Sequence, residues 1–144
     1  SLATKPDIPA VSIWAGAVYT YDDFKEYGIS DGSYRPPTSD SDRQRKRQQL
    51  FDTYGEFNSA SQFWQQVAPT NYLTDIKGAV QLNHAVNDNV VSINYSRNLN
   101  TLLNDSQIPH ELKEYSDGGH NISGANFNLA MQNTVAFFKK YLSR

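Results

Sequence analysis

The sequence predicts an α/β protein with a mostly parallel sheet flanked by helices. Two observations predict this class. Segments of strand length alternate with longer segments whose apolar residues recur at helical spacing. After the first strand the order is strand, helix, strand, helix, which is typical of parallel pairing. With 144 residues the chain fits one domain or part of one.

The first strand is followed by a long polar region. Residues 10–18 form a short, largely apolar run with the length of a buried strand. The polar region covers about 21–62 and contains the turn signal Pro36-Pro37. The basic run at 43–47 has acidic residues close by, and we interpret it as a solvated helix face in preference to a phosphate-binding patch.

The second strand and the helix after it have clear periodicities. Residues 79–84 alternate between apolar and polar, which predicts a strand. After the turn at 87–89, apolar residues recur at helical spacing and predict a helix that covers the sheet. This stripe consists of Val91, Tyr95, Leu99, Leu102 and Leu103.

The last strand and the last helix complete the pattern. Residues 110–115 read as a polar strand, the composition expected at a sheet edge. Gly118-Gly119 marks a loop, and a helix is predicted over about 123–141. We interpret its apolar face as core; that face consists of Phe127, Met131, Val135, Phe138 and Leu142.

Composition excludes several classes of protein. The net charge is −2, so no whole-chain field attracts nucleic acid. The absence of cysteine excludes disulfides, thiolate zinc sites and a cysteine nucleophile. No apolar run approaches the roughly 18 residues of a membrane helix. We therefore expect a soluble protein with neither nucleic acid nor membrane as a partner.

Two residues occupy positions where parallel sheets present reactive groups, just beyond the carboxyl ends of strands. Asp88 follows the strand that ends at His84, and His120 follows the strand that ends at Tyr115. An Asp and a His presented in this way can form the orienting half of a Ser-His-Asp triad. The alternatives are an ordinary turn-forming Asp within Asn-Asp-Asn and a loop His after Gly-Gly.

Several segments of the C-terminal part carry a family pattern. Phe-Trp-Gln-Gln-Val-Ala-Pro begins the segment 63–77, and Leu-Asn-His-Ala-Val-Asn-Asp-Asn-Val-Val occupies 82–91. Tyr-Ser-Asp-Gly-Gly-His-Asn-Ile occupies 115–122, and Val-Ala-Phe-Phe-Lys-Lys-Tyr-Leu occupies 135–142. Together they resemble the prolyl oligopeptidase and dienelactone hydrolase branch of the α/β-hydrolases. The resemblance implies that Asp88 is the triad acid.

The same resemblance implies that His120 is the triad base and that the chain is the C-terminal half of an α/β-hydrolase fold. The family has Gly at the position of Ala85 and apolar residues at those of Gln81 and Asn83, which suggests a locally altered strand end. The polar region at about 21–62 falls where such enzymes insert lid elements.

The sequence contains no candidate for the nucleophile of the triad. No G-x-S-x-G and no HGGG-like segment occurs in the chain, and Ser92 lies in the helix after Asp88, the wrong place in the order Ser, Asp, His. In the family the nucleophile precedes the strand that residues 10–18 resemble. The resemblance therefore implies a C-terminal fragment of a serine hydrolase, an esterase or a peptidase, whose Ser lies upstream. We expect this fragment alone to be inactive.

Two alternatives belong to other classes. His84, Asp88, His110 and His120 are residue types that hold zinc, but their spacing shows no H-E-x-x-H pattern, so we expect no metal and no cofactor. A non-catalytic binding module that keeps the hydrolase fold is the second alternative. The residue at the upstream nucleophile position discriminates between the enzyme and the module.

The oligomeric state of the chain is also predicted. If the first strand normally pairs with an upstream strand, its outer edge is open here and is a template for association. Apolar surface on the two helical stripes would be uncovered as well. We therefore expect self-association through this edge, burying the region of Ile13 and Trp14.

Overall fold

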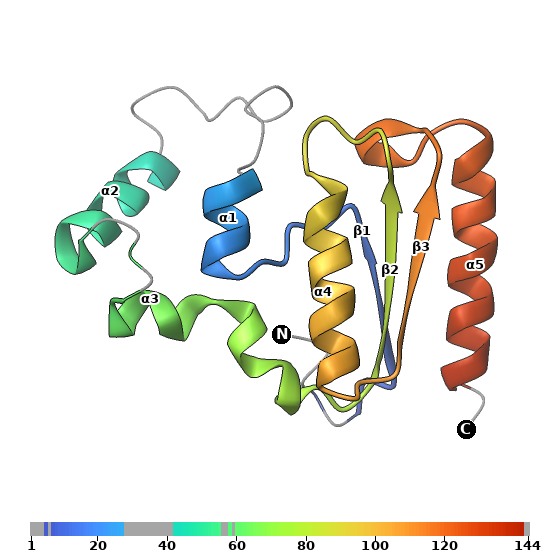
Figure 1. The fold of residues 1–144 in the computed structure, drawn as a ribbon, viewed down its shortest axis with the longest axis horizontal. Helices are drawn as coiled ribbons and strands as arrows, with labels where there is room; N and C mark the ends of the chain where they lie inside the picture. Colours follow the sequence, from blue (N-terminus) through green and yellow to red (C-terminus); the bar gives the residue numbers. More distant parts are fainter. Residues whose placement is uncertain (1–4, 6, 28–41, 56–57, 59, 143–144) are drawn as a thin grey trace.

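Three parallel strands form one sheet in the order β1-β2-β3 (Figure 1). They are β1 (Ala10–Trp14), β2 (Ala79–Ala85) and β3 (His110–Tyr115). Ala10 of β1 lies opposite Ala79, and Ala85 at the end of β2 lies opposite Tyr115. The computed structural model thus confirms the predicted α/β class with a parallel sheet.

The helices lie on both faces of the sheet. The structure describes residues 5, 7–27, 42–55, 58 and 60–142. The helical elements are α1 (Tyr21–Tyr27), α2 (Asp42–Tyr54), α3 (Gln62–Val67), η2 (Pro69–Asp75), α4 (Ile93–Asp105), η3 (Gly119–Asn121) and α5 (Ala125–Leu142). In Figure 1, α4 covers one face of the sheet and α5 covers the other. None of the helices in the described part is long and apolar enough to cross a bilayer.

The central strand β2 is buried along its whole length because helices cover both of its faces. On the α4 side, Val80 and Leu82 pack with Leu99 and Leu103 in one apolar cluster. The alternation in the sequence therefore correctly predicts a strand. Its polar positions are nevertheless not exposed, since Gln81 is fully buried.

Polar residues on the α5 side form what we call the polar layer: Ser12, Gln81, Asn83, Tyr115, Asn133 and Thr134. Gln81 Oε1 accepts hydrogen bonds from Ser12 Oγ at 2.9 Å and from Thr134 Oγ1 at 3.0 Å. The Tyr115 hydroxyl donates to Asn83 Oδ1 at 2.8 Å and accepts from Asn133 Nδ2 at 3.0 Å. The buried amides are thus paired, as buried polar groups must be.

Two predictions about strand ends are wrong. The first strand ends at Trp14, not at residue 18, because Ala15 adopts a left-handed φ of 45° that interrupts the extended backbone. The strand end at Ala85 is not altered: β2 continues regularly through Ala85, which is not among the described residues with positive φ. The absence of Gly at that position therefore has no backbone cost.

The helix α4 confirms the predicted stripe. Tyr95, Leu99 and Leu103 are buried, and Leu102 is half-buried against the same cluster. Ser92 does not lie within the helix as expected. It is the N-cap residue, and its hydroxyl oxygen accepts a hydrogen bond from the Asn94 N–H at 3.3 Å.

Three further sequence predictions concern the third strand, the basic run and the turn signal in the polar region. The third strand is confirmed as the polar edge strand β3. The basic run at 43–47 lies in α2, where Arg45 and Lys46 are exposed. The turn signal Pro36-Pro37 lies outside the described residues.

Most of the apolar face predicted for the last helix is not core in this structure, although Phe138 is partly buried against the cluster of Ala10, Ala79 and Phe137. Phe127, Met131 and Val135 are 43–46% exposed, and Leu142 is 61% exposed. The residues of α5 that face the sheet belong to another side of the helix, which carries the buried Ala130 and Phe137 together with Asn133 and Thr134 of the polar layer. This side combines hydrogen bonds to the sheet with apolar packing of Ala130 and Phe137.

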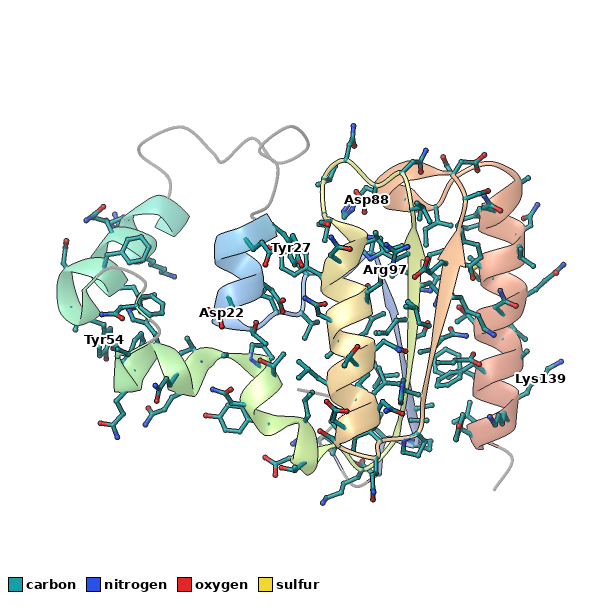
Figure 2. All side chains as sticks on the ribbon, in the orientation of Figure 1. Asp22, Tyr27, Tyr54, Asp88, Arg97 and Lys139 are labelled. Atoms are coloured by element: carbon teal, nitrogen blue, oxygen red, sulfur yellow. The ribbon has the colours of Figure 1, made fainter. Side chains whose placement is uncertain are left out.

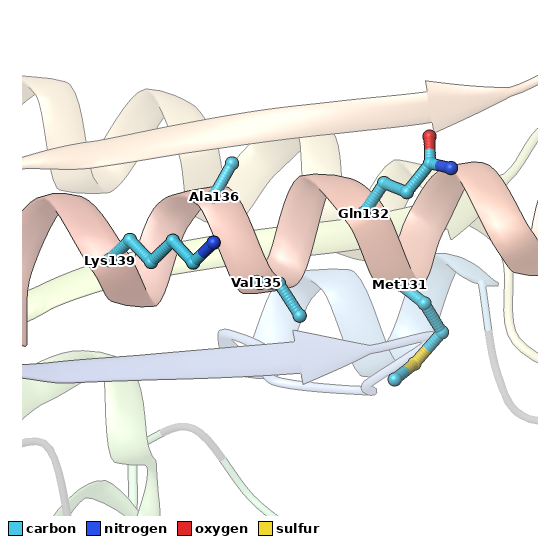
Figure 3. A pocket seen from close by; sticks show the side chains of 5 residues that line it. All are labelled: Met131, Gln132, Val135, Ala136 and Lys139. Carbon is cyan, nitrogen blue, oxygen red and sulfur yellow. The ribbon is translucent and has the colours of Figure 1, made fainter.

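The exposed stripe of α5 lies on the flank of the helix that is nearer to β1. Figure 3 shows Met131 and Val135 pointing toward that strand, whereas Gln132 and Ala136 point away from it. Met131 and Val135 line an open hollow of about 340 Å³ with Gln132, Ala136 and Lys139. The stripe of α4, in contrast, is buried, so only one of the two stripes expected to be uncovered is exposed.

We propose that the chain self-associates through β1, which pairs only with β2 among the described strands. Unpaired N–H and C=O groups on this edge, next to the exposed flank of α5, favour strand pairing with a second copy. Light scattering over a dilution series is expected to give a dimer or larger oligomer. Ile13→Lys places a charge on β1 and is expected to shift it to monomer; because Ile13 also packs against the apolar cluster of α4, the unfolding temperature is measured alongside.

The matched control is Val67→Lys, which places the same charge at a half-exposed aliphatic position in α3. It is expected to leave the oligomer intact. A monomer at high concentration that neither substitution changes would show that β1 is not the contact.

Candidate functional site

The site lies at the end of the sheet toward which the strands point. Figure 2 shows Asp88 there, above the C-terminal end of β2 and beside the start of α4. The chain turns directly after β2, where the Asp88 N–H donates to the Ala85 carbonyl at 3.2 Å. The Val86 N–H donates to the Tyr115 carbonyl at 2.7 Å, which ties this turn to the end of β3. Parallel strands commonly present functional groups at this end.

The Asp88 carboxylate is fully buried and held by several donors. Its Oδ1 accepts hydrogen bonds from the N–H groups of Val90 at 2.8 Å and Val91 at 3.0 Å. Burial alone would raise the pKa of Asp88. The hydrogen bonds from the Val91 N–H, the His120 ring and the Val90 N–H, with the His120 charge, outweigh burial and hold the pKa below its ordinary value. Asp88 is therefore ionised at neutral pH.

The loop between β3 and α5 carries His120 in the short helix η3. Gly118 begins this turn with a φ of 110°, and a Cβ there would lie 2.7 Å from the Ser123 nitrogen, so only glycine fits. The Gly119 N–H donates to Asn87 Oδ1 at 2.9 Å, which joins the His120 loop to the Asp88 loop. The two loops are thus fixed to each other.

The other end of the loop is anchored by Ile122. Its φ of 48° is unusual for a β-branched residue, yet its side chain is fully buried against Ala85, Tyr115 and Ala130. Burial of this side chain offsets the backbone strain and keeps η3 in place over the end of β2.

Asp88 and His120 are in contact, as the sequence predicted for a triad pair. His120 Nδ1 lies 3.0 Å from Asp88 Oδ2, and the His120 side chain is 36% exposed. Because an ionised carboxylate only accepts, Nδ1 carries the proton and Nε2 keeps its lone pair. The geometry suits a general base whose tautomer is set by a carboxylate.

A second histidine contacts the same carboxylate oxygen, which the sequence analysis missed. His84 Nε2 lies 3.0 Å from Asp88 Oδ2 and 3.0 Å from the Val91 carbonyl oxygen. His84 Nδ1 lies 2.7 Å from Ser96 Oγ. The sequence signal was available, because Val80, Leu82 and His84 share the α4-facing side of β2.

The remaining candidates do not join this site. His110 begins β3 at the opposite end of the sheet, where its Nδ1 contacts the Ile108 carbonyl. In the described ranges no group of three or more His, Cys, Asp or Glu side chains is arranged to hold a metal ion. Ser92 caps α4, and none of its observed contacts involves His120.

The chain was compared with known proteins. No protein-family model matches it. No curated protein matches it either. Among solved structures, it is similar to an acylaminoacyl peptidase of Pyrococcus horikoshii, with 17% identity and a TM-score of 0.64. The match covers 96% of this chain and 21% of that one.

A second solved structure gives the same result. A puromycin-hydrolyzing peptidase of Mycobacterium tuberculosis is 16% identical with a TM-score of 0.66, over 97% of this chain and 19% of that one. The chain thus spans about a fifth of the length of the structures it matches. At this identity the comparison shows the fold. The chain therefore has the parallel α/β fold that is found in a part of these two α/β-hydrolase peptidases.

Proposed function

We propose that this chain supplies the Asp and the His of a Ser-His-Asp triad in a serine hydrolase that acts on ester or peptide bonds. The observation that carries the proposal is the contact between the buried Asp88 carboxylate and His120 Nδ1 at 3.0 Å. The likeness in fold to two peptidases supports it. The nucleophilic Ser would come from sequence upstream of residue 1.

The two residues have distinct roles in this proposal. His120 Nε2 accepts the proton of the upstream Ser as that Ser attacks the substrate carbonyl, and it later returns a proton to the leaving group. Asp88 holds the Nδ1–H tautomer and stabilises the imidazolium that forms. The oxyanion donors, like the Ser, would lie upstream, and the substrate would be a small ester or a peptide.

We further propose that the region at about 21–62 is a lid-like insert beside this site. Its first helix, α1, packs on α4, where the Tyr27 ring lies 5.6 Å from that of Tyr95 at a steep angle. Burial, followed by the nearby Tyr19, Asp23 and Tyr27, raises the pKa of Tyr95 to about 12. The hydroxyl is therefore neutral, and the aromatic contact holds α1 near the start of α4, the end that carries Asp88.

A non-catalytic binding module with the same fold is the alternative. The two proposals differ at the upstream nucleophile: a G-x-S-x-G motif supports the hydrolase, and a substituted Ser supports the module. In the longer protein, a fluorophosphonate probe is expected to label that Ser once per chain. No labelling of a folded longer protein would favour the module.

The isolated 144-residue chain is expected to be inert toward the same probe. No Ser among the described contacts lies beside His120, and a triad without its nucleophile cannot form the covalent adduct. Intact mass spectrometry after incubation is expected to show the unmodified mass, with an active serine hydrolase labelled in parallel as the control. A stoichiometric adduct would mean that the chain contains its own nucleophile.

A further inference from the structure

The second histidine at the site, His84, is fully buried on the α4 side of β2. Both of its ring nitrogens are in contact with polar atoms, in three contacts of 2.7–3.0 Å. A fully buried imidazole with a complete set of partners is held in one orientation.

The partners determine where the proton of His84 lies. The Val91 carbonyl oxygen can only accept a hydrogen bond, and so can the ionised Asp88 carboxylate. His84 Nε2 contacts both, so Nε2 must carry the proton and donate it to both acceptors. Nδ1 then has the lone pair and accepts from the Ser96 hydroxyl at 2.7 Å.

The contacts also show what fixes the Asp88 carboxylate. Its Oδ1 is held by N–H groups of Val90 and Val91, which belong to the same loop and move with it. His84 belongs to β2 and is held by Ser96 of α4. Among the described side chains in contact with Asp88, His84 is therefore the one that joins the carboxylate to the rigid sheet and helix.

We propose that His84, held by Ser96 in its Nε2–H form, is a positioning residue that orients the Asp88 carboxylate and through it fixes the tautomer of His120. Both imidazoles meet the same carboxylate oxygen, so the orientation of Oδ2 set by His84 is the one that His120 encounters. His120 lies on a partly exposed loop, and Asp88 is its one described side-chain partner. Any catalytic consequence rests on the proposed function, but the tautomers do not.

Nitrogen NMR of the imidazoles in the 144-residue chain tests this directly, because the chain has only three histidines. In neutral imidazoles each tautomer has its own pattern of nitrogen chemical shifts, and the spectra are recorded at alkaline pH. In the unsubstituted chain His84 is expected as Nε2–H and His120 as Nδ1–H. A His84 found with its proton on Nδ1 could not donate to Asp88 and would overturn the proposal without any substitution.

Substitution then tests the transmission to His120. His84→Leu is expected to make the Nδ1–H form of His120 the minority form and to speed exchange of that proton with water. His84→Gln keeps an N–H donor near the same place and is expected to restore the Nδ1–H majority. His110→Leu is the matched control at the other end of the sheet, and it is expected to change neither tautomer.

A purely structural role for His84 gives a different result. His84→Leu would then change the unfolding temperature while His120 keeps its tautomer and its exchange rate. The tautomers of His84 and His120 also distinguish a failure of this proposal from a failure of the proposed function. The expected tautomers in a longer protein without hydrolase activity would support the positioning role and reject the hydrolase.

Discussion

Asp88→Asn in the longer protein is expected to lower kcat by up to about 10⁴-fold, the loss seen when a triad acid is neutralised. An asparagine side chain has one acceptor oxygen. If that oxygen keeps the bonds to the Val90 and Val91 N–H groups, its amide N–H faces the two imidazoles. His120 must then accept at Nδ1 and carry its proton on Nε2, where it cannot take the proton of the Ser.

The readout is kcat and KM with an ester substrate, alongside the unfolding temperature. We expect the loss in kcat with a folded protein. Asp105→Asn, at the exposed end of α4, is the matched control and should leave kcat unchanged. Near-normal kcat in Asp88→Asn would remove Asp88 from the triad.

His120→Ala is expected to lower kcat at least as much, about 10⁴-fold or more, because the general base itself is lost. The side chain is 36% exposed, so the fold should tolerate its removal. The comparison is with His110→Ala, which removes an imidazole at the opposite end of the sheet.

A further comparison uses the double variant. If Asp88 acts only through His120, Asp88→Asn should add almost nothing once His120 is absent, since residues that act as a unit are strongly non-additive. Losses that multiply in the double variant would mean that Asp88 acts independently of His120.

The sheet could be predicted from the sequence because periodicity carries most of the information on strands and simple amphipathic helices. The alternation at 79–84 and the stripe of α4 both report burial against an apolar layer. The end of β1 could not be predicted, since the left-handed conformation of Ala15 has no signal in an apolar run of small residues.

The face of α5 was predicted wrongly for a physical reason. Counting apolar residues assumes that a helix meets the sheet with its most apolar side. The side that meets it carries Asn133 and Thr134 as well as the buried Ala130 and Phe137, because Gln81 and Tyr115 offer the two polar residues partners. Such mutual satisfaction depends on residues far apart in the chain, and a local pattern does not show it.

The contacts of the candidate site were predicted in part. The proximity of Asp88 and His120 could be expected from their places after strands, since parallel strand ends meet at one edge. The contact of His84 with Asp88 could not be found in this way. Whether a buried His donates to a carboxylate depends on the partner of its other ring nitrogen. For His84 that partner is Ser96, which α4 brings to Nδ1.

The polar layer between α5 and the sheet has a consequence for how this part of the molecule can evolve. An apolar interface tolerates gradual sequence change, because one aliphatic side chain can replace another and the helix can shift slightly to repack. In the polar layer each partner is specific: Thr134 and Asn133 each donate one hydrogen bond to a buried oxygen of the sheet, and loss of either bond costs about 0.5–1.5 kcal/mol. An aliphatic replacement at either position therefore removes a bond that it cannot supply, which restricts gradual change at this contact. Since α5 follows directly on the loop of His120, the same restraint preserves the direction in which that loop leaves the sheet across sequence divergence.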